Sequence, residues 1–219
     1  ELIKLIKRLK KEKYDIAIIP HRYLRSTLIA FLSGIKKRVG YSNSGGRIFL
    51  TKKVDYRKDL HEVQRLLKLI DKDRVKVENS SIELYPNEKD RKKIKKIWNE
   101  NNLDSYKIIT IAPGSKWHTK KWPLEYYNQL IKKLTKNEKV RIILIGGEDE
   151  KDLKTESGEG IINLIGKTSL LEVAEILNRS DILIGNDSSP LHIASAFDTY
   201  IVAIFGATTQ SLGFFPWSK

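Results

Sequence analysis

The 219-residue sequence contains neither cysteine nor methionine. The lack of cysteine excludes disulfide bonds, thiolate metal sites and cysteine nucleophiles. Long apolar runs are also missing, since no stretch reaches the roughly 18 apolar residues that predict a transmembrane helix. Residues 1–8 mix aliphatic and charged side chains and lack the apolar core of a secretory signal. We expect a soluble, cytoplasmic protein, and we interpret a chain without an initial methionine as part of a longer one.

Negative charge is scarce relative to positive charge. The sequence has 27 Asp and Glu against 41 Lys and Arg, which gives a formal net charge of +14. With 40% hydrophobic and 31% charged residues, the composition excludes a disordered tail and a collagen-like repeat. The length suffices for two compact domains of about a hundred residues each. The charge is compatible with an anionic membrane surface or a nucleic acid. No helix-turn-helix, RRM or KH signature appears, and we expect no nucleic-acid partner.

Helical and extended patterns alternate along the first half. Aliphatic residues recur every three or four positions in the helical segments, and short apolar runs mark the strands. The patterns predict helices at 1–12, 24–32, 61–70 and 88–100 and strands at 14–19 and 38–41, with 47–54 extended and 81–85 a possible strand. We place the domain boundary so that residues 1–98 form the first domain and residues 99–219 the second.

The second half alternates more regularly. It predicts strands at 107–112, 140–145, 161–165, 181–185 and 200–205, separated by helices at 124–134, 149–154, 170–178 and 190–196. This alternation is typical of an α/β fold with a parallel sheet and helices on both faces. Ligands of such folds bind beyond the carboxyl ends of the strands, so the residues that follow each strand are the candidates for a site.

The loop at 113–123 is suited to a phosphorylated ligand. It combines glycine, hydroxyl and lysine side chains and ends at Pro123, where the next helix is expected to begin. Glycine lets a backbone approach phosphate oxygens, and lysine supplies a point charge. A solvated loop with incidental lysines explains the same residues.

Two further loops contain acidic and hydroxyl side chains. Residues 146–150 are two glycines followed by three acids, which fit either a carboxylate that binds a ribose or a glycine turn before an acidic helix start. Residues 185–192 bring an acid, two serines, a proline and a histidine into one turn. That turn either binds an anion or simply caps a helix. Neither a GxGxxG motif nor a Walker loop is present.

Five motifs in register resemble the ADP-heptose:lipopolysaccharide heptosyltransferases of glycosyltransferase family 9, and most closely their heptosyltransferase II branch. The motifs are Pro113-Gly-Ser with Lys120-Lys-Trp-Pro123, Gly146-Gly-Glu-Asp-Glu150, Gly166-Lys-Thr-Ser-Leu170, Gly185-Asn-Asp-Ser-Ser-Pro-Leu-His192 and Phe205-Gly-Ala-Thr208. The first half is similar to the family through Tyr14-Asp-Ile-Ala-Ile-Ile-Pro20, Arg25-Ser-Thr-Leu28 and Gly34-Ile-Lys-Lys-Arg-Val-Gly-Tyr41.

The resemblance implies a GT-B glycosyltransferase, with two Rossmann-like domains whose parallel sheets face a central cleft. The C-terminal domain would bind ADP-L-glycero-D-manno-heptose, and the N-terminal domain would bind the lipopolysaccharide inner core, heptosyl-Kdo-lipid A. The transfer would invert the sugar and need neither a metal ion nor a cofactor other than the donor substrate. It would take place at the anionic inner face of the inner membrane of a Gram-negative bacterium, which a basic protein contacts peripherally.

The resemblance also assigns roles to individual residues. It implies catalytic roles for Lys120 and His192, as cations near the diphosphate that stabilise the charge of the departing ADP. It also implies a catalytic role for Asp187, in the turn that holds the diphosphate and, through Asp187, the sugar. The residues that it implies at the nucleotide sugar are Ser115, Lys120, Glu150, Thr168, Asp187, Ser188, Ser189 and His192. Glu150 would hold the ribose, and Thr168 would lie in a loop beside the adenine. Candidate acceptor contacts are Arg22, Arg25, Arg38 and Arg47.

Two departures from the family and two alternative functions stay open. The general base of the family is an aspartate in the first strand-to-helix loop, for which this chain has no match. We therefore expect the first β-α-β unit and the closing helices to be missing. Ser189 and Asp198-Thr199 also stand where glycine is more usual in the family. The alternatives are a GT-B enzyme that uses a UDP or GDP sugar, and a basic nucleotide-binding or nucleic-acid-binding module without turnover.

Overall fold

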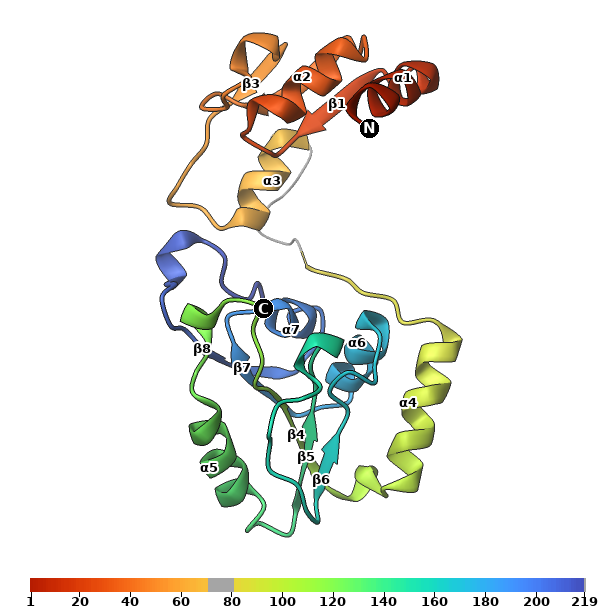
Figure 1. Cartoon of the computed structure of the whole chain (residues 1–219), viewed down its shortest axis with the longest axis vertical. Coiled ribbons are helices and arrows are strands. Elements are labelled where there is room, and N and C mark those ends of the chain that lie inside the picture. Colours follow the sequence, from red (N-terminus) through yellow and green to blue (C-terminus); the bar gives the residue numbers. More distant parts are fainter. Residues whose placement is uncertain (71–80, 219) are drawn as a thin grey trace. The chain divides into compact units, whose positions relative to one another are not determined.

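The computed structural model describes residues 1–70 and 81–218. The chain divides into two compact units (Figure 1). The first comprises Glu1–Ser80 and Ser211–Phe214, and the second comprises Ser81–Gln210 and Phe215–Lys219. No helix among the described residues combines the length and the apolar composition needed to cross a membrane.

The first unit is built on a parallel three-stranded sheet, in the order β1-β2-β3. Its elements are α1 (Leu2–Glu12), β1 (Ile16–Ile19), α2 (Leu24–Leu32), β2 (Lys37–Tyr41), the 3-10 turn η1 (Arg47–Phe49), β3 (Lys52–Val54) and α3 (Glu62–Ile70). Ile16 of β1 pairs with Lys37 of β2, and Val39 of β2 pairs with Lys52 of β3. Because all three strands are parallel, their carboxyl ends lie at one edge of the sheet.

The second unit contains a parallel five-stranded sheet, in the order β6-β5-β4-β7-β8. Its helices are α4 (Glu88–Glu100), α5 (Leu124–Leu134), α6 (Leu170–Asn178) and α7 (Ser189–Ala194). Its strands are β4 (Lys107–Ala112), β5 (Val140–Leu144), β6 (Ile161–Asn163), β7 (Ile182–Asn186) and β8 (Tyr200–Ile204). The short turns are η3 (Leu103–Ser105), η4 (His118–Lys120), η5 (Glu148–Glu150) and η6 (Gln210–Leu212).

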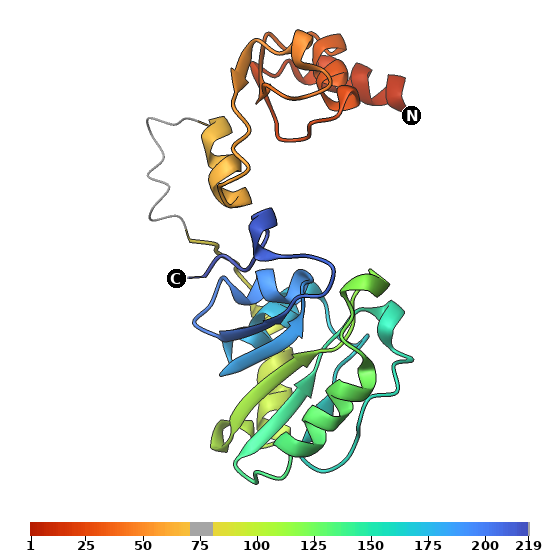
Figure 2. The same cartoon turned by 90° about the vertical axis from the view of Figure 1, so that its left-hand side faces the viewer.

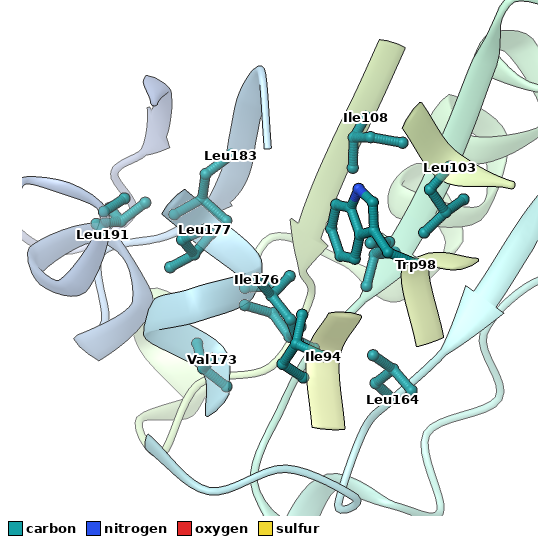
Figure 3. Packing of buried hydrophobic residues seen from close by; sticks show 14 residues of the cluster. Ile94, Trp98, Leu103, Ile108, Leu164, Val173, Ile176, Leu177, Leu183 and Leu191 are labelled. Carbon is teal, nitrogen blue, oxygen red and sulfur yellow. The ribbon is translucent and has the colours of Figure 1, made fainter. Parts of the chain in front are cut away.

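Successive residues of the central strands face opposite sides of this sheet, as the strand period of two requires. Ile108 and Ala112 of β4 pack with α4, α6 and α7, whereas Ile109 and Ile111 pack with α5. In Figure 2, α5 (green) and α4 (yellow) accordingly lie on opposite sides of the sheet. Figure 3 shows Ile94 of α4 beside the residues of α6 on one of these faces. The second unit therefore has a hydrophobic core on each side of its sheet.

Local signals fix the starts of two helices in the second unit. The side chain of Ser169 accepts a hydrogen bond from the Glu172 backbone amide (3.2 Å), and the Glu172 carboxylate accepts one from the Ser169 amide (2.9 Å). Asn87 and Asp90 form the same reciprocal pair at the start of α4. Each pair satisfies backbone donors that a helix start leaves free.

The structure confirms the predicted alternation of helices and strands and corrects several details. The sequence analysis assigned residues 88–98 to the first domain, but α4 belongs to the second unit, because Ile94 and Trp98 are buried in its core. The division thus falls at residue 80 and not at residue 98. Residues 81–85 form no strand, since no neighbouring strand pairs with them in the described part of the chain.

Two further predictions about single elements were wrong. The predicted helix at 149–154 is only the 3-10 turn η5, in which the Glu150 carboxylate accepts a hydrogen bond from the amide of Gly147 (3.0 Å). Within 47–54, only Lys52–Val54 is a strand, and Arg47–Phe49 forms the turn η1. Neither segment has a periodic pattern of apolar side chains that distinguishes a turn from a longer element.

Candidate functional site

The strand order of the second unit reverses between β4 and β7. The chain runs from β4 outward to β5 and β6, returns to the other side of β4 as β7, and continues to β8. Ala112 and Gly185, near the carboxyl ends of β4 and β7, pair in register. Open parallel sheets bind ligands beyond such a switch point, because the loops leave it in opposite directions and open a crevice. The loops after β4 and β7 are therefore the candidate site.

Lys120, Asp187 and Thr208 form a charged cluster beyond this point. Lys120 Nζ lies 2.6 Å from Asp187 Oδ2, and Thr208 Oγ1 donates a hydrogen bond to the same oxygen at 2.7 Å. Asp187 is 6% exposed, and the Lys120 side chain is 25% exposed. The cluster therefore presents a partly exposed ammonium group that a buried carboxylate holds in place.

The environment keeps Asp187 ionised. Burial alone raises the pKa of its carboxyl, but the hydrogen bonds from Lys120 and Thr208, with the charges of Lys120 and His192, lower the pKa below its ordinary value overall. Hydrogen bonds to the charged form and nearby cations favour that form. At neutral pH the cluster thus combines a carboxylate with an ammonium group.

Glu150 lies over the loop that follows β4. Its carboxylate accepts a hydrogen bond from the Gly147 amide, and a side chain at Gly114 would overlap it. Only glycine at position 114 lets the backbone pass this close to the carboxylate. Ser115 is buried, and its Oγ accepts a hydrogen bond from the Trp117 amide (3.4 Å). Ser115, the next residue in the chain, and the Glu150 carboxylate are therefore both close to Gly114.

The turn after β7 carries three more of the predicted residues. Ser188 is the N-cap of α7 and makes no side-chain capping bond; its Oγ instead donates to the Asn186 carbonyl (3.1 Å). Ser189 is exposed, with Pro190 in the first turn of the helix. His192 is half-buried and close enough to contribute to the lowered pKa of Asp187. Asp187, Ser188 and His192 are therefore neighbours.

Thr168 follows β6, which is two strands away from β4 in the sheet. Its Oγ1 is buried and has no hydrogen-bond partner in the structure. A buried hydroxyl without a partner loses free energy on folding, and so it is a candidate to bind a ligand group. Its place after a strand matches the prediction, although it lies apart from β4 and β7 in strand order.

The predicted acceptor arginines all lie in the first unit. Arg22, Arg25 and Arg47 are exposed, and the Arg22 guanidinium lies 4.2 Å from the centre of the Tyr56 ring. Arg38 differs, since it donates hydrogen bonds to the carbonyls of Phe49 (2.5 Å) and Lys36 (3.2 Å). Arg38 thus ties β2 to the turn η1, a structural role that the sequence analysis did not foresee.

The sequence analysis missed two residues of the site. Asn186 is fully buried and bonds to the loop after β4, and Thr208 donates to Asp187. Both stand inside quoted motifs, and a signal for Asn186 was available, because a buried amide at the end of a strand needs polar partners. Among the described ranges, no three His, Cys, Asp or Glu residues are grouped so that they could hold a metal ion.

Comparison with known proteins identifies the family. The family model for glycosyltransferase family 9 (heptosyltransferase) matches residues 2–219. Lipooligosaccharide heptosyltransferase 2 of Haemophilus influenzae is 28% identical over 215 residues, which cover 91% of this chain and 62% of that protein. The chain therefore spans less than two thirds of the length of this relative.

Solved structures show the same fold. The structure of the Escherichia coli ADP-heptose lipopolysaccharide heptosyltransferase II matches with a TM-score of 0.76 and 23% identity, over all of this chain and 70% of that one. A family 9 glycosyltransferase from Veillonella parvula matches with a TM-score of 0.82 and 23% identity, over 99% of this chain and 64% of that one. The fold is of the GT-B type, with a Rossmann-like parallel sheet in each unit. From the match over nearly its whole length, the chain belongs to glycosyltransferase family 9, the heptosyltransferases.

Proposed function

We propose that this chain forms part of an enzyme that transfers a heptose from ADP-L-glycero-D-manno-heptose to the inner core of lipopolysaccharide, heptosyl-Kdo-lipid A. The transfer inverts the sugar and requires no metal ion. The observation that carries the proposal is the Lys120–Asp187 pair at the switch point of the second sheet, in a chain that matches the heptosyltransferase family. The ADP-heptose donor is supported by the name of the E. coli structure of the same fold.

The chemistry follows from where charge develops. As the bond between the heptose and the diphosphate breaks, negative charge grows on the departing ADP. A cation that the protein already holds in place stabilises this charge more in the transition state than in the ground state. Lys120 is such a cation, because Asp187 and the loop fix its position before a ligand binds. His192, whose charge contributes to the lowered pKa of Asp187, would add a second cation near the diphosphate.

The remaining donor contacts surround this pair. Ser115 and Ser188 offer hydroxyls from the loops after β4 and β7, and Ser189 offers one from the first turn of α7. We propose that Glu150 accepts the hydroxyls of the ribose, since a carboxylate that follows a strand does so in dinucleotide folds. Thr168, whose buried hydroxyl has no partner, then serves the adenine end of the donor.

The first unit would bind the acceptor. Its exposed arginines Arg22, Arg25 and Arg47 suit the phosphate and carboxylate groups of a phosphorylated, Kdo-bearing lipid. The net charge of +14 supports peripheral contact with an anionic membrane face in the cytoplasm of a Gram-negative bacterium. We assign no residue of the chain as the general base.

The test is a calorimetric titration with ADP, UDP, GDP and a short single-stranded RNA at one salt concentration. Salt must be fixed, because the affinity of a basic protein for polyanions depends on it. We expect selective binding of ADP. Lys120→Ala should weaken ADP binding about tenfold or more, since a hydrogen bond to a charged group contributes about 1.5 to 3 kcal/mol.

Lys107→Ala is the matched control. Lys107 pairs with Asp181 at 2.8 Å at the opposite, amino end of β4 and β7, so its loss removes the same charge at a distance from the site. ADP affinity should then be unchanged. If ADP binding weakened equally in both variants, the loss would be explained by the change in net charge alone. That result would contradict the role of Lys120. Preference for UDP or GDP would favour another GT-B donor, and RNA binding without nucleotide preference would contradict the proposal.

A further inference from the structure

Asn186 is the last residue of β7, and its side chain is completely buried. It stands directly before Asp187, at the point where the strand order reverses. A buried amide group must find partners for both its oxygen and its nitrogen, because unsatisfied polar atoms cost free energy in the interior. The hydrogen-bond partners of the Asn186 side chain all belong to the loop that follows β4.

The side chain makes three hydrogen bonds to backbone groups. Its Oδ1 accepts from the amide of Trp122 at 2.8 Å. Its Nδ2 donates to the carbonyls of Pro113 (2.9 Å) and Gly114 (3.1 Å). Two acceptors and one donor converge on it, and only a side-chain amide presents two N–H donors and an acceptor in that arrangement. The chemistry of the partners therefore requires asparagine in place of aspartate.

These bonds join the two ends of one loop. Pro113 and Gly114 come just before Ser115, and Trp122 comes just after Lys120 and Lys121. Gly114 also passes under the Glu150 carboxylate, so its position sets the spacing between the loop and Glu150. Asn186 thus bonds to both ends of the segment that carries Ser115 and Lys120.

We infer that Asn186 is a positioning residue for the diphosphate of the nucleotide ligand, because it holds the 113–122 loop so that Lys120 meets Asp187 before the ligand arrives. The inference rests on the proposed function for the identity of the ligand. Preorganised groups bind and stabilise charge better than mobile ones, since no ordering cost is left at the moment of binding. Asn186 would act through this loop, because its side chain is completely buried and its amide group bonds to the loop backbone.

The first experiment compares Asn186→Ala with Ser180→Ala in the full chain. Ser180 is a buried partner of Thr110 (2.8 Å), and it precedes β7 at the end of the sheet away from the loop. Both variants remove a buried hydrogen-bonding group, and we expect both to lower the melting temperature. Only Asn186→Ala should weaken ADP binding by about tenfold and speed hydrogen exchange of the amides in 113–122.

The second variant, Asn186→Asp, tests the hydrogen-bond pattern itself. An ionised Asp still accepts from Trp122 but faces the carbonyls of Pro113 and Gly114 without a proton to donate. Burial and the facing carbonyl oxygens raise the pKa of such a carboxyl. When protonated, it donates one bond again. We therefore compare the ADP affinity of this variant with that of the wild type at each pH. The affinity of Asn186→Asp should approach the wild-type value as the pH falls. The affinity of Asn186→Ala should stay equally far below the wild-type value at every pH.

The results test two claims separately, namely the positioning role of Asn186 and the proposed function. Unchanged ADP affinity in Asn186→Ala, or an equal loss in Ser180→Ala, overturns the positioning role. The positioning role is also overturned if the ADP affinity of Asn186→Asp, relative to the wild type, does not change with pH. A wild-type chain that binds no ADP overturns the proposed function and the ligand named here, whereas hydrogen exchange of residues 113–122 still shows whether Asn186 orders the loop.

Discussion

The two units of the chain bury their apolar residues to different extents. In the second unit, helices cover both faces of the five-stranded sheet, and the two cores contain fully buried residues from β4, β5 and β7. In the first unit, the cores are two small clusters around Ile19 and Tyr41. Aliphatic side chains remain exposed on its first helix and strand, namely Leu2, Ile3, Leu5, Ile16 and Ile18.

The helix α1 illustrates the difference. It has a clear apolar stripe with lysines between, yet none of its residues is buried. Beside it lies an open, mainly apolar hollow of about 340 Å³, lined by α1, β1 and α2. A sequence period predicts that a helix forms and which face is apolar, but it does not say what covers that face. The second unit completes its own core, whereas the first leaves an apolar edge open in this chain.

Among the variants that test this comparison, Ile143→Ala should have the largest effect on the free energy of unfolding. Ile143 of β5 is fully buried in the second core, and its truncation leaves a cavity, so we expect the free energy of unfolding to fall by about 4 kcal/mol. Ile19→Ala in the first unit borders the open hollow and should cost about 2 kcal/mol, because little new cavity forms. The measurement is urea unfolding followed by tryptophan fluorescence and far-ultraviolet circular dichroism.

The two signals separate the units. All four tryptophans, Trp98, Trp117, Trp122 and Trp217, belong to the second unit. The fluorescence transition should therefore move with Ile143→Ala and stay in place with Ile19→Ala. Equal losses from both variants would mean that the two cores are packed alike.

Arg65→Met should have the next effect, in the first unit. Arg65 is 3% exposed, pairs with Glu62 at 2.8 Å and donates to the carbonyl of Leu212 at 2.9 Å. The bond to Leu212 is one of the contacts that join residues 211–214 to the first unit, beside the bond from the Glu62 amide to the Gly213 carbonyl (2.8 Å). The substitution removes the buried guanidinium and leaves the Leu212 carbonyl without this donor, so we expect a loss of about 2 kcal/mol and faster hydrogen exchange at 211–214.

Arg179→Met provides the counterpart in the second unit. Arg179 pairs with Glu175 at 2.6 Å, and there the carboxylate is the buried partner. We expect a comparable loss of stability but no change of exchange at 211–214. If exchange at 211–214 rises in both variants, Arg65 does not hold this segment specifically.

Thr208→Val should have the smallest effect on the free energy of unfolding. This effect should depend on pH in the acid range. Asp187 has a lowered pKa, so its stabilising contribution is present above the pKa of the unfolded chain and is lost as the pH falls through that of the folded chain. Losing the Thr208 bond raises the folded pKa toward the ordinary value. We expect the free energy of unfolding to fall by about 1 kcal/mol near neutral pH. As the pH is lowered, the variant should lose the remaining stabilisation from the ionised Asp187 at a higher pH than the wild type does.

The measurement is urea unfolding at a series of pH values from about 2 to 6. Ser42→Ala is the control in the first unit, because Ser42 donates to the Asp55 carboxylate at 3.1 Å on the exposed surface. Its stability should match that of the wild type throughout. An acid profile of Thr208→Val that overlays the wild type would show that Thr208 does not stabilise the ionised Asp187.

Local sequence patterns predicted the elements where side chains of one segment decide its structure. The apolar runs at 107–112 and 140–145 predicted β4 and β5, which lie between two layers of helices. The Ser169–Glu172 capping pair, three residues apart, marks the start of α6. The patterns failed where the deciding partner lies elsewhere. The apolar stripe of α4 predicts the helix, but only the burial of Ile94 and Trp98 in the second core assigns it to the second unit.

For the candidate site, the sequence indicated the loops but not their connections. The lysine, acid and hydroxyl residues after β4 and β7 were identified from their chemistry and from the family motifs. The pairing of Lys120 with Asp187, 67 residues later, depends on β4 and β7 being neighbours in the sheet. Asn186 and Thr208 were missed for the same reason, since their partners are distant in sequence.

The sequence by itself determined the order of helices and strands, the parallel sheet of the second half and the loops that carry charge, because these depend on periodicity and on local hydrogen bonds. Only the tertiary structure decided which loops meet, that α4 belongs to the second unit, and that Asp187 stays ionised although buried. The physical reason is that strand order brings distant residues within hydrogen-bond reach, and burial then makes each such bond necessary.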